Sequence, residues 1–185
     1  MTAATQIPGY VVGTWDIDPV HSDVSFSVRH MMVSKVKGRI SQFSGTIVTG
    51  ETFESSTVTA ALDATSIDTN NEQRDGHIKS ADFFETEKYP EWTFVSTAIT
   101  TDGSDYKLDG DLTIKGVTKP VSLYLEIGGF GPDAYGGTRA GFTATTTINR
   151  NDFGVDISMP MDGGGVVVGE KVQLTLEIEA VLRTA

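Results

Sequence analysis

Apolar and polar residues alternate with a period of two through most of the chain. Val24, Phe26 and Val28 share one parity, while serines and an arginine occupy the other. The same pattern recurs over 15–17, 36–47, 58–64, 92–99, 106–115, 121–127, 140–148 and 172–182. This period is typical of strands with one buried face. Long, evenly amphipathic strands with short connections predict an all-β fold, an eight-stranded antiparallel barrel rather than a sandwich.

The parity of the pattern changes once inside the stretch 36–47. Val36 and Ile40 fall on one face by period, whereas Phe43 and Ile47 fall on the other. A β-bulge has this effect, because it inserts one extra residue into a strand and bends it. We therefore predict one long strand with a bulge at Ser41-Gln42.

The segment from Ser66 to Phe84 breaks the alternation and is dense in charge. Thr69 and Glu72 have the spacing of a capping box, in which each side chain accepts from the other residue's free backbone N–H. The segment ends in the aromatic pair Phe83-Phe84. We predict a short helical insertion between strands that closes one end of the barrel.

Several positions of the inward parity carry very small side chains. They are Gly38, Ala60, Ala64, Ala98, Gly110, Ala140, Ala144 and Ala180. An eight-stranded barrel is either filled by side chains or holds one small ligand. Small inward residues favour a cavity, and an uncharged apolar lining favours an apolar ligand. The alternative is that large residues such as Trp92 and Phe94 fill the space above the small ones.

The composition is that of one folded domain spanning residues 1–185, with an ordered core of about 12–183. A formal net charge of -11 argues against nucleic acid, or an anionic membrane surface, as the main partner. The charge is unevenly distributed, because no acidic residue lies between Asp23 and Glu51, whereas four basic residues do: Arg29, Lys35, Lys37 and Arg39. This basic stretch indicates either a site for an anionic head group or a solvated pair of strands.

Cysteine is absent, which excludes disulfides and thiolate chemistry. The N-terminal residues have neither the basic start nor the apolar core of a signal peptide. No apolar run approaches the ~20 residues that span a bilayer as a helix. The expectation from the chain as given is a cytoplasmic protein without stable membrane insertion.

Five motifs occur in register along the chain. They are Trp15-x-Ile-Asp-Pro-x-His-Ser22, Ser66-Ile-Asp-Thr-Asn with Arg74-Asp-x-His-Ile-Lys-Ser-Ala-Asp-Phe-Phe84, Tyr89-Pro90, Gly110-Asp-Leu-Thr-Ile-Lys-Gly-Val-Thr-Lys-Pro120 and Asn149-Arg-x-Asp-Phe-Gly154. Together they resemble the YceI-like family of polyisoprenoid-binding proteins. The resemblance implies a lipocalin-like barrel, commonly a homodimer, that holds an isoprenoid lipid or quinone. It implies no enzymatic activity and no cofactor.

These expectations assign roles to particular residues. A lipid tail is expected against the barrel lining: Phe26, Val28, Leu62, Trp92, Phe94, Leu108, Leu112, Leu123, Phe142, Ala144, Leu174 and Leu176. The polar head is expected near Arg74, Asp75, His77, Arg29 and His30. The methionines Met31, Met32, Met159 and Met161 fall in two loops, where they flank the tail's entry or simply anchor the loops.

Catalysis and metal binding are the alternatives to simple binding. The three histidines His21, His30 and His77 lack the spacing of a helical zinc site, so no metal is expected. A hydrolase or isomerase acting on a lipid-like substrate would use His77 with Asp75 or Asp82. The remaining polar residues, especially Asp18, His21, Arg150 and Asp152, suit a buried network that ties the helix to the barrel.

Overall fold

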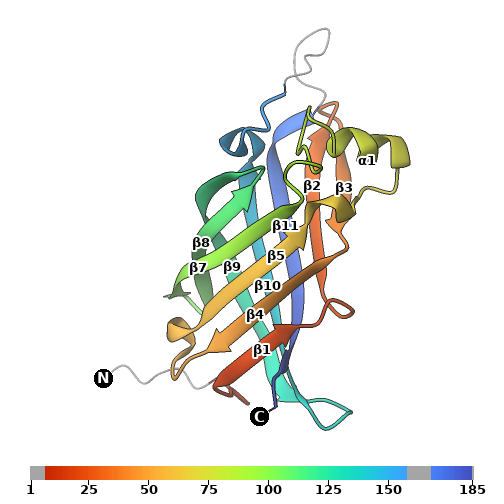
Figure 1. Ribbon diagram of the computed structural model, residues 1–185. Helices are drawn as coiled ribbons and strands as arrows, with labels where there is room; N and C mark the ends of the chain where they lie inside the picture. The colour runs from red at the N-terminus through yellow and green to blue at the C-terminus, as the bar shows by residue number, and fades with distance from the viewer. Residues whose placement is uncertain (1–6, 158–167, 185) are drawn as a thin grey trace.

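The computed structural model describes residues 7–157 and 168–184 (Figure 1). It contains eleven strands, one α-helix and three short 3₁₀ turns. The strands are β1 (Gly13–Ile17), β2 (Asp23–His30), β3 (Ser34–Ile40), β4 (Phe43–Thr49), β5 (Thr57–Asp63), β6 (Ile67–Asp68), β7 (Glu91–Asp102), β8 (Asp105–Ile114), β9 (Val117–Pro132), β10 (Thr138–Asn149) and β11 (Val168–Leu182). The helix is α1 (Glu72–Ile78), and the 3₁₀ turns are η1 (Phe53–Ser55), η2 (Ala64–Ser66) and η3 (Arg150–Phe153). No helix of the described ranges is both long and apolar enough to cross a bilayer.

Eight of the strands close into an antiparallel barrel. The order is β1-β4-β5-β7-β8-β9-β10-β11, and pairing of β1 with β11 completes the circle. The predicted barrel is therefore confirmed. The long strand β11 has two successive neighbours on one side: its residues up to Glu177 pair with β2, and Ala180–Leu182 pair with β1. The β2–β3 hairpin and the short β6 thus extend the wall toward the end that carries α1 (Figure 1).

The phase change at Ser41-Gln42 is real, but the predicted bulge is wrong. These two residues separate β3 from β4, which have different partners: β3 pairs with β2 and β6, and β4 pairs with β1 and β5. A register shift lies instead in β7, between Ser96 and Ala98. It turns Ala98 outward into solvent and leaves Ile99 buried, so Ala98 is not an inward residue as predicted.

The helix forms where predicted, but its cap differs. Asn71 is the N-cap, and its side chain accepts a hydrogen bond from the backbone N–H of Arg74 at 2.9 Å. The predicted Thr69–Glu72 capping box is therefore wrong. Asn71 lies one residue before the helix, where a short polar side chain reaches the free N–H groups of the first turn. Thr69 is buried and bonds elsewhere.

The core divides into two clusters along the barrel. One contains Trp15, Phe53, Phe142 and their neighbours; we call the end of the barrel that it fills the closed end. The other includes Ile67, Trp92 and Phe153. It lies toward the end covered by α1, which we call the helix end (Figure 1).

Candidate ligand-binding cavity

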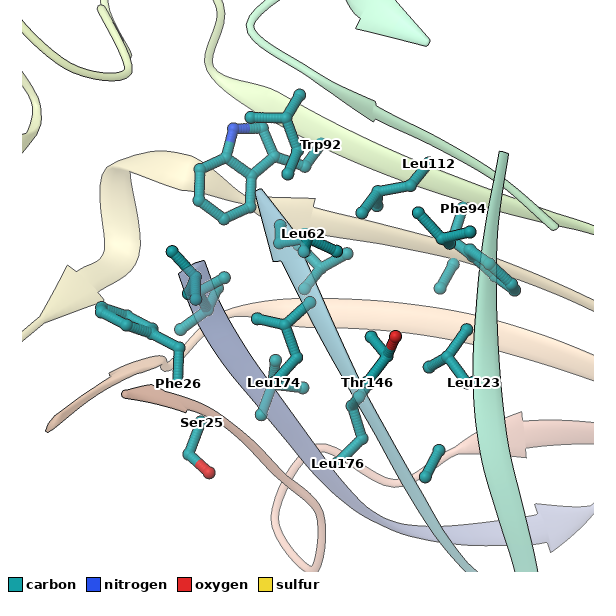
Figure 2. A pocket seen from close by; sticks show the side chains of 18 of the residues that line it. Ser25, Phe26, Leu62, Trp92, Phe94, Leu112, Leu123, Thr146, Leu174 and Leu176 are labelled. Atoms are coloured by element: carbon teal, nitrogen blue, oxygen red, sulfur yellow. The ribbon is translucent and has the colours of Figure 1, made fainter. Parts of the chain in front are cut away.

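An internal cavity of about 420 Å³ lies within the barrel, and its wall is almost wholly apolar (Figure 2). Strands from every side of the barrel contribute to it, because the inward parity of each strand is apolar. All of the residues predicted to contact a tail line this cavity: Phe26, Val28, Leu62, Trp92, Phe94, Leu108, Leu112, Leu123, Phe142, Ala144, Leu174 and Leu176. The volume lies within the range of small-molecule sites.

The small inward residues serve two different purposes. At Gly38 and Gly110 an added Cβ would clash with the rings of Phe26 and Phe94, which lie over these glycines. Aromatic rings therefore fill this space, as the alternative prediction held. Ala60 and Ala144 line the cavity, whereas Ala140 and Ala180 are fully packed in the closed end. The barrel interior is therefore partly filled by aromatic rings and partly open as a cavity.

The cavity reaches the surface at the helix end, beside partly exposed arginine and histidine side chains. The cations Arg29 and Arg74 line it there together with His30 and His77, and we call these four residues the cationic rim. Within residues 7–157 and 168–184 no Asp or Glu lines the cavity. In a chain with net charge -11 this is a local reversal of charge.

Arg74 is held in place by the segment that precedes its helix. Its Nε donates to Thr69 Oγ1 at 2.8 Å and its Nη2 donates to the Thr69 carbonyl at 2.7 Å. Asp75 accepts from the Thr69 backbone N–H and from the Thr69 hydroxyl, at 2.8 and 2.5 Å. Asp75 does not line the cavity; it fixes the residue that orients Arg74.

His77 pairs with Asp82 rather than with Asp75. Its Nε2 lies 2.9 Å from Asp82 Oδ2, and its ring packs edge-on against Phe83. Both partners of this pair are about half exposed or more, with side-chain exposed fractions of 47% and 61%. Phe83 and Phe84 also line the cavity, and the Phe84 ring lies 4.8 Å from that of Trp92.

Met31 and Met32 do not line the cavity. Met31 and Met32 form the tip of the β2–β3 hairpin and are exposed. Met159 and Met161 lie outside the described residues. The rim residues Arg29 and His30 end strand β2 immediately before this tip.

Arg150 is a lining residue that sequence reasoning placed in a structural network only. It is buried, and its guanidinium donates to the carbonyls of Val155, Gly169 and Val168 at 2.7, 2.9 and 3.3 Å. Burial lowers its pKa, because desolvation disfavours the charged form. Arg150 belongs to the Asn149–Gly154 motif, but the alternation of apolar and polar residues does not show that η3 turns its side chain toward the cavity.

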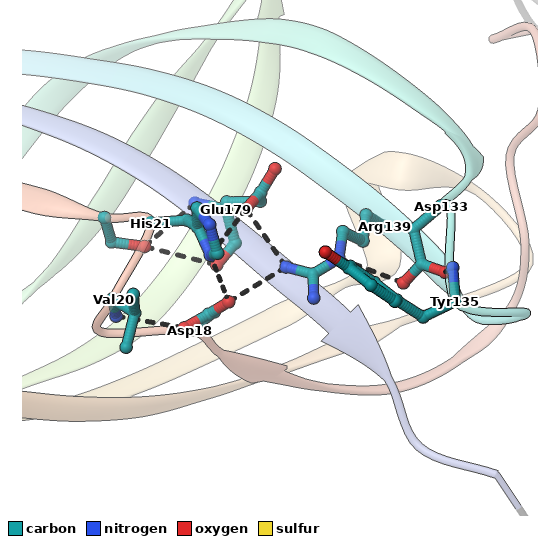
Figure 3. Close-up of polar contacts among 8 residues, drawn as sticks. Asp18, Val20, His21, Asp133, Tyr135, Arg139 and Glu179 are labelled. Atoms are coloured by element: carbon teal, nitrogen blue, oxygen red, sulfur yellow. Dashed lines mark hydrogen bonds and ion pairs between the residues drawn. The ribbon is translucent and has the colours of Figure 1, made fainter.

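Asp18 and His21 belong to a separate cluster on the outer face of the barrel (Figure 3). His21 Nδ1 lies 2.8 Å from Asp18 Oδ2. Arg139 donates to Asp18, Glu179 and Asp133 at 2.9–3.0 Å. The hydrogen bonds from His21 and Arg139 lower the pKa of Asp18 to about 2. The predicted buried network that ties the helix to the barrel is therefore wrong: Asp18 contacts His21 and Arg139 on the outer face, Arg150 lies in the cavity wall, and Asp152 is exposed.

Ligand-type atoms of Asp18, His21 and Glu179 gather within 4.8 Å of one another in this outer cluster. The guanidinium of Arg139 already supplies the positive charge between the two carboxylates. These contacts of Arg139 join the β1–β2 connection to strands β10 and β11, which indicates a structural role.

The fold and the cavity define a lipocalin-like β-barrel with room for one ligand. The chain belongs to the YceI-like family: residues 15–180 match the YceI-like domain. Protein YceI of Escherichia coli O17:K52:H18 is 38% identical over 167 residues, which cover 90% of this chain and 84% of that protein.

Solved structures share the fold. Burkholderia cenocepacia BcnA superposes with a TM-score of 0.76 at 24% identity, covering 88% of this chain and 98% of that one. A polyisoprenoid binding domain from Saccharophagus degradans, implicated in plant cell wall breakdown, gives a TM-score of 0.70 at 16% identity. That match covers 94% of this chain and 100% of the domain.

Proposed function

We propose that this protein binds an isoprenoid lipid, such as a polyisoprenoid quinone or a polyprenyl lipid, and carries, stores or senses it. The tail occupies the barrel and the head group lies at the cationic rim. One observation carries the proposal: an apolar cavity, open at the helix end, whose only charged lining groups among the described residues are arginines. Membership of the YceI-like family supports it, as does the polyisoprenoid-binding description of the Saccharophagus domain.

The energetics suit a chain-like ligand. Burial of one five-carbon isoprene unit contributes roughly 4 kcal/mol before costs, at ~0.8 kcal/mol per carbon. Association and ordering cost about 4–15 kcal/mol, so a few units already offset them. Tail length is therefore set by the dimensions of the cavity and by the head group more than by hydrophobic affinity.

The head group is assigned to Arg74, His77, Arg29 and His30, with Asp75 acting through Thr69 to hold Arg74. A guanidinium with a fixed stem presents its donors to a carbonyl, hydroxyl or phosphate oxygen without reordering. The methionines at the tail's entry, the homodimer and the cytoplasmic location stay predictions.

The first experiment identifies the ligand. Organic extraction of the purified protein followed by mass spectrometry is expected to yield a prenyl lipid in a defined ratio to protein. Delipidated protein is then titrated with geranylgeraniol while Trp92 fluorescence is followed. Trp92 lines the cavity and Trp15 is buried in the closed end, so Trp92→Phe is expected to abolish the change. Absence of both a co-purified lipid and a saturable response would contradict the proposal.

The second experiment tests the rim. Arg74→Gln is expected to weaken binding of geranylgeranyl phosphate about tenfold, since a hydrogen bond to a charged group contributes ~1.5–3 kcal/mol. Binding of geranylgeraniol should change much less. Arg39→Gln is the matched control, because Arg39 is exposed beside Asp68 and does not line the cavity. Equal losses of affinity for both ligands would mean that Arg74 does not bind the head group.

The catalytic alternative names His77 with Asp75 or Asp82, and His77 Nε2 does lie 2.9 Å from Asp82 Oδ2. Binding rather than catalysis is proposed because the side chains of this pair are 47% and 61% exposed, so the pair is open to solvent. A hydrolase or isomerase would lose turnover in a His77→Ala variant that still binds the lipid. Incubation of the wild type with the extracted lipid, analysed for products by mass spectrometry, is expected to return the lipid unchanged. Product formation that disappears in His77→Ala would instead establish the enzyme.

A further inference from the structure

Three consecutive apolar side chains project from the tip of the β2–β3 hairpin. Met31, Met32 and Val33 have exposed fractions of 41%, 48% and 86%. Isolated exposed apolar residues are ordinary on protein surfaces. Here they are adjacent, at the point of a hairpin that extends the wall at the helix end (Figure 1).

The backbone of this tip is unusual for the residues it holds. Met31 and Met32 have φ values of 55° and 62°, and the N–H of Val33 donates to the carbonyl of His30 at 3.3 Å. A hairpin turn with positive φ at both central residues favours Asn and Gly. Two methionines in the left-handed region destabilise the turn relative to Asn-Gly. Folding alone therefore does not account for them.

Cations stand directly behind the apolar tip. Arg29 lies opposite Lys35 in the β2–β3 ladder, and Lys37 lies two residues further along β3. Like charges directly opposite each other destabilise a strand pair unless a counter-charge lies between them. No ion pair joins these three cations to any carboxylate in the described part of the chain. The hairpin thus carries an apolar tip with unneutralised positive charge beneath it.

We propose that the β2–β3 hairpin docks the protein on a bilayer that contains anionic phospholipid. Met31, Met32 and Val33 enter the boundary between head groups and acyl chains, while Lys35 and Lys37 meet the phosphates. This arrangement reconciles the local positive charge with a net charge of -11, because the tip of the hairpin makes the contact with the membrane.

Docking by this hairpin also positions the cavity. Val28, Arg29 and Val36 belong to the same hairpin and line the cavity wall. The rim therefore faces the bilayer, where lipophilic molecules reside. A protein partner is a poorer match, since specific protein interfaces bury about 1,200–2,000 Å² and a three-residue tip supplies far less. The proposal goes beyond ligand binding and holds for any occupant of the barrel.

Vesicle flotation tests the proposal. The wild type is incubated with vesicles of phosphatidylcholine alone or of phosphatidylcholine with phosphatidylglycerol, at low and at high salt. We expect flotation with the anionic vesicles and a decrease as salt screens the charges. The variant Met31→Asn, Met32→Gly, Val33→Thr should reduce the partition coefficient at least ~tenfold. Lys35→Gln and Lys37→Gln should reduce it about fivefold each.

The matched control is Val20→Asn with Tyr135→Asn, two residues with exposed fractions of 82% and 88% in other loops. It should float like the wild type. The hairpin variant carries a favoured Asn-Gly turn, so its thermal midpoint should not fall. If the midpoint does fall, flotation of Lys35→Gln and Lys37→Gln tests the proposal instead. No flotation, equal flotation on neutral vesicles, or an equal loss in the control overturns the proposal. Geranylgeraniol titration without vesicles reports ligand binding separately.

Discussion

The two ends of the barrel share a strand pattern and differ in how their interiors are filled. At the closed end six aromatic rings pack against one another, those of Tyr10, Trp15, Phe53, Tyr106, Phe130 and Phe142. The indole N–H of Trp15 donates to Thr49 Oγ1 at 2.9 Å. At the helix end the buried indole nitrogen of Trp92 has no hydrogen-bond partner among the described residues.

The difference arises from what each end receives from outside the eight strands. The segment before β1 packs Ile7, Tyr10 and Val11 against the closed-end cluster, and the Tyr10 hydroxyl donates to the Gly50 carbonyl at 2.6 Å. The helix end receives α1 instead, a helix with no buried residue. An apolar segment fills a barrel, whereas a polar helix covers it and leaves a cavity beneath.

The largest expected effect comes from removing each end's tryptophan. Trp15→Ala should lower the free energy of unfolding by about 3–5 kcal/mol, because a fully buried ring and its hydrogen bond are lost. Trp92→Ala should cost at least about 1 kcal/mol less, since its ring borders the cavity and its unpaired N–H is removed with it. Urea denaturation of both variants measures the difference. Equal losses would mean that the two ends are packed alike.

A matched pair of alanines gives the next effect. Ala140→Leu adds atoms to the closed end and should destabilise the protein by about 1–3 kcal/mol. Ala60→Leu adds the same atoms to the cavity wall, so stability should change by less than about 1 kcal/mol. Its effect should appear in geranylgeraniol binding, which the larger side chain obstructs. An Ala140→Leu variant with an unchanged urea midpoint would contradict the close packing of the closed end.

The smallest effect concerns the outer cluster of Asp18, His21 and Arg139. Because the pKa of Asp18 is lowered from 3.8 to about 2 in the folded protein, its stabilisation is complete above pH ~4. It is lost as the pH falls through about 2. Asp18→Asn should therefore differ from the wild type in urea midpoint at pH 6, and the difference should shrink between pH ~4 and ~2.

Asp82→Asn is the control at the helix end, because exposed pairs such as His77–Asp82 contribute little to stability. If the difference in urea midpoint between the wild type and Asp18→Asn stays constant down to pH 2, the ion pair of Asp18 is not the cause of that difference.

The barrel and its lining were predictable from sequence because each strand buries one parity. That rule correctly placed Phe26, Leu62 and Leu174 on the inner face before any pairing was known. It failed at Ala98, where one extra residue in β7 reversed the parity. The parity change at Ser41-Gln42 was visible, but alternation alone does not distinguish a bulge within one strand from a break between β3 and β4, which have different partners.

The rim was only partly predictable. The charge of the 66–84 segment identified Arg74 and His77, but not that Thr69 organises Arg74 and Asp75, because that contact depends on where the loop before α1 runs. Arg150 was missed as a lining residue for a similar reason: its direction is set by η3, a turn of four residues. Tertiary contacts, not local propensity, decide such orientations.

The rings over Gly38 and Gly110 bear on how the depth of this cavity is set. Any side chain at either glycine would force the ring of Phe26 or Phe94 to move, and both rings line the cavity. An added Cβ at Gly38 would also lie 2.9 Å from Thr69 Cγ2, and one at Gly110 would lie 2.7 Å from the carbonyl oxygen of Val95. One added methyl group would thus alter the depth of the cavity without an insertion or a new strand.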